Sequence, residues 1–245
     1  MIERQIGIVT RDGRMNTFIC HPERDSPHPA IIIFMDAPGI REELRDMARR
    51  LGTVGYYVML PNLYYRSNVE ELASAVGGAN VDMRQKALQL MATINIPMVM
   101  QDVDALLAFS AEDKAASRGP MGCVGYCMSG QYAINAAARH KERIRAAASI
   151  YGVELVSDKP GSPHLALQRT DARLYFGCAE NDSYAPLPMI EQLRAEIDVK
   201  GVSAEVEIYP GTAHGFAFPS RPVYDKPAAE RHWERLFALF GAALK

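Results

Sequence analysis

The sequence predicts an α/β protein with a mostly parallel central sheet and helices on both of its faces. Short apolar runs bounded by turn residues alternate along the chain with stretches whose apolar residues recur at helical spacing. Some of these runs, such as 29–36, are apolar almost throughout, which is typical of strands buried on both faces. The 245 residues contain no repeat, linker or low-complexity tract. We therefore expect one domain over residues 1–245.

The chain is expected to open with an antiparallel hairpin, because two strand-like segments are divided by Asp12-Gly13, a favoured two-residue turn. Further strands are expected at 29–36, 56–63, 119–126, 144–152, 172–179 and 202–209. The last of these alternates apolar and polar residues, as a half-exposed strand near the sheet edge does.

Helices are expected between these strands. One helical face carries Leu44, Met47, Ala48 and Leu51. Later helices are expected from about Pro97, at 128–140, at 187–199 and along the C-terminal stretch that contains Trp233, Leu236, Phe237 and Phe240. The less regular segment 64–96 is expected to form short helices or a lid over the sheet, and the segment 153–170 is expected to be a loop insertion or a second small lid.

Composition and charge exclude several classes of protein. Hydrophobic residues make up 48%, charged residues 23% and the net charge is −2, so no basic stripe indicates nucleic-acid binding. No apolar run is long enough to predict a membrane span. The N-terminus is charged from its third residue and lacks the apolar stretch of a signal peptide, which favours a cytoplasmic location. We expect a small molecule as partner, and a monomer or weak homo-oligomer.

The four cysteines fit no zinc-binding spacing. On one extended strand Cys123 and Cys127 would lie about 13 Å apart, too far for a disulfide. Reduced thiols are therefore expected. Cys20, Cys123 and Cys178 are interpreted as small core residues.

Cys127 stands where a strand is expected to turn into a helix, in the stretch Gly125-Tyr126-Cys127-Met128-Ser129-Gly130. A nucleophile on such a turn adopts strained backbone angles and needs small neighbours, a demand that Gly125 and Ser129 meet. A helix N-terminus also favours the thiolate. Ser129 is a weaker candidate, because it lies inside the helix rather than at its tip.

Two partners for this thiol also follow expected strands, at the edge of the sheet where α/β proteins bind ligands. Asp182 follows the strand at 172–179, with Glu180 as its rival for an orienting acid. His214 follows the strand at 202–209 and is flanked by Gly211 and Gly215. Their order along the chain, nucleophile then acid then histidine, is the order found in α/β-hydrolases.

An oxyanion hole needs two backbone N–H donors. The residue after the nucleophile, Met128, is expected to supply one. The other is expected from the loop after the strand at 29–36, where Ala37 is the natural donor because Pro38 has no N–H.

With these residues in place, the sequence resembles the dienelactone hydrolase family, the branch of the α/β-hydrolases that uses a cysteine nucleophile. The resemblance covers almost the whole chain and is most specific at Gly125-Tyr126-Cys127, at "END" ending on Asp182, and at "AHGF" around His214. It implies the α/β-hydrolase fold, a Cys127–Asp182–His214 triad, and carboxymethylenebutenolidase-like hydrolysis of an ester or lactone through a thioester. No cofactor or metal is implied.

The family also places a carboxylate near the thiol, and Asp36 occupies that position here, where glutamate is usual. A carboxylate beside a thiol disfavours the thiolate. The hypothesis is that Asp36 keeps Cys127 protected until substrate arrives, and the alternative is that Asp36 only shapes the turn.

Family members that act on dienelactone hold its carboxylate with arginines. Here Phe218 stands four residues after His214, and the next arginine is Arg221. Other candidates for substrate binding lie in or near the expected lid: Arg84, Arg66, Tyr64 and Tyr65. The departure leaves the substrate open between dienelactone and another small ester, lactone or thioester.

Two alternatives to a hydrolase are a binding protein and a dinucleotide-binding enzyme. A non-catalytic binding or regulatory protein on the same fold remains an alternative, because a fold does not determine function. A dinucleotide-binding enzyme is disfavoured, because no Gly-x-Gly-x-x-Gly turn follows an early strand.

Overall fold

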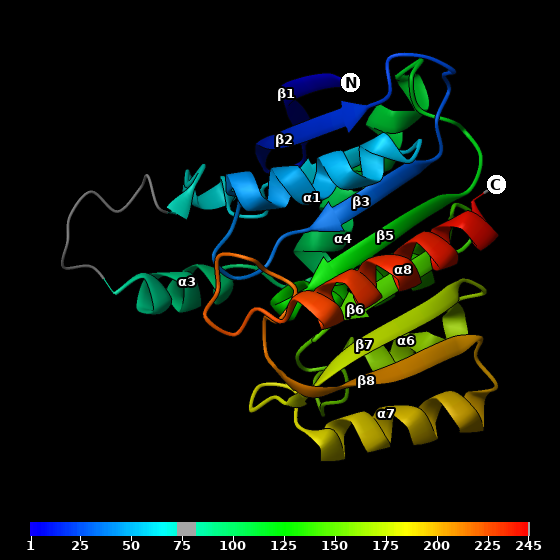
Figure 1. The fold of residues 1–245 in the computed structure, drawn as a ribbon. Helices are drawn as coiled ribbons and strands as arrows, with labels where there is room; N and C mark the ends of the chain where they lie inside the picture. The colour runs from blue at the N-terminus through cyan, green and yellow to red at the C-terminus, as the bar shows by residue number, and fades with distance from the viewer. Residues whose placement is uncertain (73–81, 245) are drawn as a thin grey trace. The chain divides into compact units, whose positions relative to one another are not determined.

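The computed structural model describes residues 1–72 and 82–244. The chain divides into two compact units, Met1–Gly119 and Pro120–Lys245 (Figure 1), and each is described by itself. The expectation of a single domain stays a prediction.

The described part of the first unit, residues 1–72 and 82–119, contains four strands in the order β1-β2-β4-β3. These are β1 (Ile2–Thr10), β2 (Gly13–His21), β3 (Ala30–Phe34) and β4 (Tyr57–Pro61). β2 is antiparallel to both β1 and β4, whereas β3 and β4 are parallel. Every residue of β3 and β4 is buried, as the uninterrupted apolar runs predict.

The predicted N-terminal hairpin is confirmed, but its turn lies one residue earlier than expected. Thr10 pairs with Gly13, so the two turn residues are Arg11 and Asp12 and Gly13 begins β2. The φ angle of Gly13 is +143°, a backbone conformation that favours glycine. The glycine therefore belongs to the strand side of the turn.

Among the described residues of the first unit, the helices are α1 (Glu42–Thr53), η1 (Tyr65–Ser67), α3 (Met83–Met91) and α4 (Ile96–Glu112). The four apolar residues predicted for one face of α1 are all buried. α4 begins beside Pro97 as predicted, with the side chain of Asn95 capping its N-terminus. The expected lid at 64–96 contains η1 and α3, and its residues 73–81 lie outside the described part of the chain.

Helices α1 and α4 lie on opposite faces of the strands of this unit. Neighbouring residues of a strand point to opposite faces. On β1, Glu3 pairs with Arg49 of α1, whereas Arg4 pairs with Asp113 at the end of α4. Figure 1 shows α1 in front of these strands and α4 behind them.

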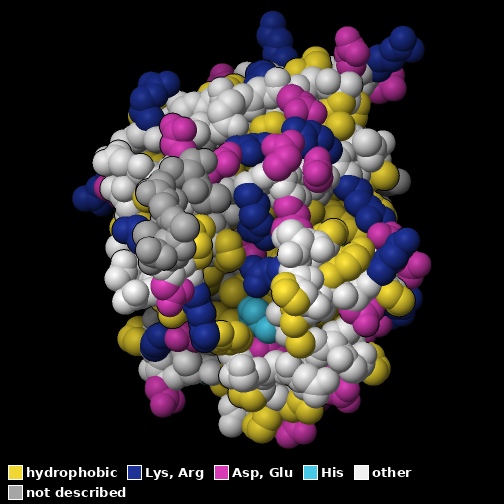
Figure 2. Space-filling view, turned by 60° about the vertical axis from the view of Figure 1, so that its left-hand side comes forward, with side chains coloured by type: hydrophobic (Ala, Val, Ile, Leu, Met, Phe, Trp, Pro, Cys, Tyr) yellow, Lys and Arg dark blue, Asp and Glu magenta, His cyan; other side chains and the backbone are white. Residues whose placement is uncertain are grey.

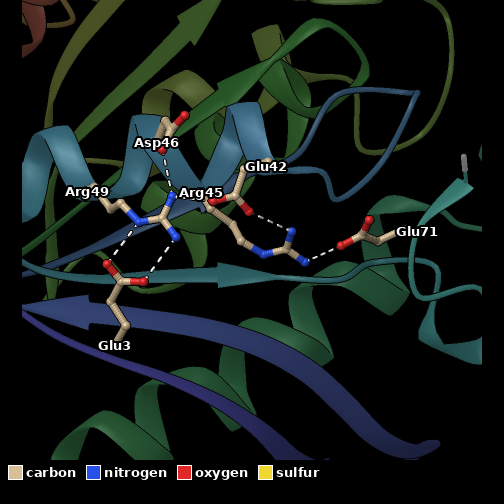
Figure 3. A network of polar contacts seen from close by, with 6 residues as sticks. All are labelled: Glu3, Glu42, Arg45, Asp46, Arg49 and Glu71. Carbon is tan, nitrogen blue, oxygen red and sulfur yellow. Dashed lines mark hydrogen bonds and ion pairs between the residues drawn. The ribbon is translucent and has the colours of Figure 1, made fainter. Parts of the chain in front are cut away.

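A network of ion pairs fastens α1 to its surroundings. Arg49 donates to Glu3 of β1 and to two carboxylates of α1 itself, and Arg45 reaches Glu71 beyond η1. Figure 3 shows all six members: Glu3, Glu42, Arg45, Asp46, Arg49 and Glu71. A single exposed ion pair contributes little, whereas shared geometry makes a network more effective. The network therefore fixes both β1 and the segment that enters the expected lid.

The second unit contains four parallel strands in the order β5-β6-β7-β8. These are β5 (Met121–Tyr126), β6 (Ile144–Ile150), β7 (Arg173–Asn181) and β8 (Ala204–Ala213). β5 is buried throughout, whereas β8 is mostly half-exposed. The prediction that this last strand lies at the sheet edge is confirmed.

The longer helices of the second unit are α5 (Gly130–Arg139), α7 (Leu187–Lys200) and α8 (Lys226–Ala243). They agree with the three helices predicted there. The segment 153–170, expected as a loop, also contains two short helices, α6 (Pro163–Ala166) and η3 (Leu167–Arg169). Pro163 stands in the first turn of α6, where proline favours helix formation rather than a loop.

Helices α5 and α8 cover opposite faces of β5. The thiol of Cys123 donates to the carbonyl of Ala133 in α5. The neighbouring Gly122 faces α8, because a Cβ added there would stand 2.7 Å from the ring of Phe240. Helices therefore pack on both faces of the strands, and the predicted mixed α/β fold with mostly parallel strands is confirmed.

The cysteine prediction is also confirmed, since all four cysteines are free and Cys20, Cys123 and Cys178 are buried. On the face in Figure 2, basic and acidic side chains of the described residues are interspersed rather than gathered by sign. Within the described residues, no single helix is long and apolar enough to cross a membrane. Helices α3 and α4 together have the length and composition of a membrane span, but they are bent by 81° at the break between them.

Candidate active site

Cys127 stands at a sharp turn between β5 and α5. Its φ angle is +55°, a left-handed conformation that non-glycine residues rarely adopt and that costs about 1–3 kcal/mol. A short 3-10 helix, η2 (Cys127–Ser129), joins the strand to α5. The thiol is half-buried, so it is accessible from solvent while the residues around it are packed.

Glycines and a small serine make this turn possible. A Cβ added at Gly125 would stand 2.0 Å from the carbonyl oxygen of Ser129, a backbone atom that cannot move aside. A Cβ at Gly130 would stand 2.3 Å from the hydroxyl oxygen of Ser149. Ser129 is fully buried inside the turn. The small residues inferred from the sequence are therefore a steric requirement of the turn.

Asp182 and His214 meet at the ends of two neighbouring strands. β7 ends at Asn181 and β8 ends at Ala213, so each residue directly follows its strand. Nδ1 of His214 lies 2.7 Å from Oδ2 of Asp182. β8 runs four residues further than the predicted strand, which leaves no loop before His214.

The carboxylate of Asp182 is fixed on its other side as well. Its Oδ1 accepts the backbone N–H groups of Tyr184 at 2.8 Å and Ala185 at 3.1 Å. The Asp182 side chain is fully buried. Bound by these three donors, the carboxylate holds His214 in one orientation and keeps the proton on Nδ1.

The pKa of His214 is raised to about 9. Burial alone would lower it, but hydrogen bonds and charges from Asp182 and Cys127 outweigh that effect. The imidazole therefore interacts with the Cys127 side chain as well as with Asp182. The site can hold a thiolate and an imidazolium side by side.

Glu180, the rival for the orienting acid, lies elsewhere. Its exposed carboxylate accepts the backbone N–H of Gly211 at 2.7 Å, which ties the end of β7 to β8. The geometry thus brings Asp182, and not Glu180, to His214.

Two tyrosines that the sequence reading did not select enclose His214. The ring centroid of Tyr151 lies 5.1 Å from that of His214, and the ring centroid of Tyr184 lies 4.9 Å from it. Tyr151 is buried, directly follows β6 and has a φ angle of +38°. That position after a strand, shared with Cys127 and His214, is the signal that could have found it.

A second pair of contacting side chains, next to the turn, is not predicted by the sequence. The Tyr126 hydroxyl lies 3.2 Å from Nε2 of His232, and both side chains are fully buried. His232 lies in α8. It supports the residue that precedes Cys127 from α8, a contact between distant segments that no local pattern reveals.

Arg221 lies close to the histidine. A Cβ added at Gly215 would stand 2.9 Å from Cδ and 3.2 Å from Nη1 of Arg221, so this side chain runs beside the residue that follows His214. Its guanidinium carbon lies 5.2 Å from the ring centroid of Phe218. Of the arginines considered from the sequence, Arg221 is the one that the second unit holds next to His214.

The remaining predicted site residues belong to the first unit. Asp36 is fully buried and accepts from both terminal nitrogens of Arg41, at 2.5 and 3.2 Å. Burial would lower the pKa of Arg41, but Asp36 raises it. The carbonyl of Ala37 accepts the Tyr64 hydroxyl at 2.7 Å.

The other lid candidates in the first unit have structural partners. The Tyr65 hydroxyl and the Arg66 guanidinium both donate to buried Asp102, and Arg66 also binds Asp12. Arg84 stands exposed in the first turn of α3. Arg66 therefore forms an ion pair with a buried carboxylate.

Within residues 1–72 and 82–244, no group of three or more His, Cys, Asp or Glu side chains is arranged to hold a metal ion. The groups gathered around His214 are a thiol, a carboxylate and two aromatic rings.

The chain is similar in sequence to known proteins over most of its length. A model of the family described as "Dienelactone hydrolase family" matches residues 15–244. The chain is 27% identical to "Putative carboxymethylenebutenolidase" of Methylorubrum extorquens, over 99% of this chain and 83% of that protein. The protein of the same name from Escherichia coli is 26% identical, over 95% of this chain and 84% of its own.

Among solved structures, a similar fold is found in the crystal structure titled "Putative Dienelactone Hydrolase" from Klebsiella pneumoniae. The TM-score is 0.87 over 98% of each chain, at 22% sequence identity. At that identity the likeness concerns the fold.

Proposed function

Because the chain belongs to the dienelactone hydrolase family, we propose that it cleaves a small ester or lactone with Cys127 as nucleophile. Membership confirms the predicted family and the enzyme class, an ester or lactone hydrolase. One observation carries the proposed mechanism: a strained cysteine at a strand-to-helix turn interacts with a histidine, raising its pKa, and a buried aspartate orients that histidine.

In the first half of the proposed cycle, the Cys127 thiolate attacks the carbonyl carbon of the substrate. The tetrahedral intermediate collapses, the carbon–oxygen bond to the alcohol breaks, and His214 gives its proton to the leaving alkoxide. The product of this step is a thioester on Cys127 and a neutral imidazole.

In the second half, the neutral His214 removes a proton from a water molecule that attacks the thioester carbonyl. Collapse of the second tetrahedral intermediate releases the carboxylic acid and returns Cys127 as a thiolate beside an imidazolium. Asp182 accepts from Nδ1 of His214 and stabilises the imidazolium.

The oxyanion of both intermediates is proposed to be held by two backbone N–H groups, those of Met128 and Ala37. Met128 is buried in the first turn after Cys127, where a helix begins. Loss of one such donor typically costs about 2.7–4 kcal/mol of transition-state stabilisation.

We propose that Arg221 binds a carboxylate or other acidic group of the substrate. Its position beside Gly215 supports this role. A rate preference for lactones or esters that carry a carboxylate, lost in Arg221→Gln, is the expected result. Tyr64 and Tyr65 donate to the Ala37 carbonyl and to Asp102 within the first unit, and with Arg84 they remain weaker candidates.

A cytoplasmic location and a reaction without a cofactor are also proposed. Four free cysteines, three of them buried, fit a reducing compartment. Neither proton transfer nor the thioester needs a group beyond the residues named above.

Replacement of Cys127 tests the proposal. Cys127→Ala is expected to abolish hydrolysis of activated short esters and lactones while the protein keeps its circular dichroism spectrum and thermal midpoint. His214→Ala is expected to lower kcat/KM nearly as far. Cys123→Ala is the control, because that thiol is fully buried against α5 and lies outside the proposed chemistry. Activity of Cys127→Ala at the wild-type level would overturn the mechanism, and inactivity of the wild-type protein on every ester would favour the binding-protein alternative.

A further inference from the structure

Tyr184 is an exposed aromatic residue in contact with the proposed general acid. Its relative accessible surface is 50%. Among the described residues, no other aromatic side chain is exposed to this degree. Its ring centroid lies 4.9 Å from that of His214, with the two planes inclined by 57°. Half of the side chain is therefore open to contact with a bound molecule.

The backbone that carries this ring is held by the site itself. The backbone N–H of Tyr184 donates to Oδ1 of Asp182, while Oδ2 of the same carboxylate binds His214. The turn that carries Tyr184 and the imidazole therefore share one buried anchor, which keeps the start of the Tyr184 side chain near His214.

The two tyrosines around His214 differ in what they can contact. Tyr151 is almost completely buried and packs on Phe216 and Phe218 as well as on His214. Tyr184 presents the other half of its surface to solvent. A bound molecule can therefore pack against Tyr184, whereas Tyr151 is part of the core.

The direction of proton transfer says which part of a substrate passes this ring. His214 gives its proton to the oxygen of the leaving alcohol, so that oxygen must lie within hydrogen-bonding reach of the imidazole. The carbon atoms attached to it then lie close to the imidazole ring, which Tyr184 contacts. The acyl part stays bonded to Cys127.

We propose that Tyr184 determines specificity for the alcohol part of the substrate, favouring planar, unsaturated or aromatic alcohols that pack against its ring. This inference rests on the proposed function and concerns the acylation half of the cycle. In a lactone the alcohol is tethered to the acyl group, and the same ring would receive the unsaturated carbons next to the ring oxygen.

Kinetics can separate this role from a structural one. For two acetate esters the acyl-enzyme is identical, so its hydrolysis does not depend on the alcohol. The ratio kcat/KM reports acylation, in which the alcohol is still present. A residue that contacts the alcohol changes kcat/KM by different factors for different alcohols. A residue that only supports His214 changes all of them alike.

The test compares phenyl acetate with trifluoroethyl acetate in three variants: Tyr184→Ala, Tyr184→Phe and Val199→Ala. Aromatic pairs are worth enough to predict a loss of roughly three- to tenfold in kcat/KM for phenyl acetate in Tyr184→Ala. For trifluoroethyl acetate the loss is expected to stay below about twofold, since little ring contact is removed. Tyr184→Phe keeps the ring and should keep the preference. Val199 is 85% exposed at the end of α7 and serves as the control for an exposed apolar truncation.

A second readout guards against an indirect effect through His214. The pH dependence of iodoacetamide alkylation of Cys127 is expected to keep its wild-type midpoint in Tyr184→Ala. Equal losses for both esters, no loss for either, or a shifted midpoint would overturn the proposal. Failure of the nucleophile assignment shows separately, as wild-type activity in Cys127→Ala.

Discussion

At the scale of single residues, the sequence already predicts Cys127, Asp182 and His214, because each has a reactive side chain directly after a strand. It also favours Asp182 over Glu180, and the geometry agrees, with Asp182 on the imidazole and Glu180 on Gly211. What no pattern reveals is the second oxygen of Asp182, which is held by two backbone N–H groups of its own turn. Such contacts depend on backbone angles rather than on residue type.

The raised pKa of His214 predicts how the reactivity of the thiol varies with pH. The imidazolium beside Cys127 should persist up to about pH 9. The rate constant for alkylation of Cys127 by iodoacetamide should therefore change between two levels as pH rises, with the midpoint of that change near pH 9. In Asp182→Asn a charge and a charged hydrogen bond that raise the pKa of His214 are removed, so the midpoint should move to lower pH. The alkylation rate measured from pH 6 to 10 checks this. The same midpoint in both proteins would show that Asp182 does not hold the proton.

The ion pair of Asp36 sharpens the hypothesis that this residue protects the thiol. Arg41 binds both oxygens of Asp36 and would be left with a buried, uncompensated charge in Asp36→Ala. Asp36→Asn keeps the shape of the side chain and removes only the charge. If Asp36 disfavours the thiolate, Asp36→Asn should be alkylated several-fold faster at pH 7 than the wild type.

The control for this measurement is Asp102→Asn, which alters another buried, arginine-paired carboxylate of the first unit. It should leave the alkylation rate within about twofold of wild type. Equal rates for Asp36→Asn and wild type would assign Asp36 to the turn alone.

At the scale of elements, the turn between β5 and α5 is the feature that the sequence predicts most sharply. Gly125, Cys127 and Ser129 indicate a tight turn through their size, and the φ angle of +55° at Cys127 agrees. The contact of Gly130 with Ser149 was not predictable, because β6 is a separate strand whose register sets it.

Gly125→Ala is expected to be severely destabilising, by about 3 kcal/mol or more, because the added Cβ would collide with the Ser129 carbonyl. Gly241→Ala is the matched control. Gly241 lies within α8 with no atom in reach of an added Cβ, so alanine there should stabilise by up to about 1 kcal/mol. Urea unfolding of both variants measures the two changes, and a Gly125→Ala protein as stable as wild type would contradict the packing described for the turn.

At the scale of the whole molecule, the alternation of apolar runs and helical patterns predicts every strand of both units and their main helices. The differences are local. The hairpin turn lies at Arg11-Asp12, β8 extends to Ala213, and the segment 153–170 forms two short helices. Strand ends and short helices depend on hydrogen bonds between distant segments, which periodicity does not encode.

His214 also links folding to pH. Its pKa of about 9 in the folded protein exceeds the ordinary value of about 6.5, so the folded state binds the proton more tightly. The resulting stabilisation is fully present below about pH 6.5 and is lost as pH rises through about 9. Its size is a few kcal/mol at most. The difference in unfolding free energy between wild type and His214→Gln should therefore shrink from pH 6.5 to pH 9.5, and a constant difference would contradict the raised pKa.

The most direct test of the central claim is intact-mass spectrometry of the protein quenched in acid during turnover of an activated acetate ester. The account predicts one added acetyl group, found after digestion on the peptide that contains Cys127 and removed by hydroxylamine at neutral pH, as a thioester is. Cys127→Ala should carry no such group. An acetyl group on Ser129 instead, or full turnover by Cys127→Ala without any covalent adduct, would contradict the thioester mechanism.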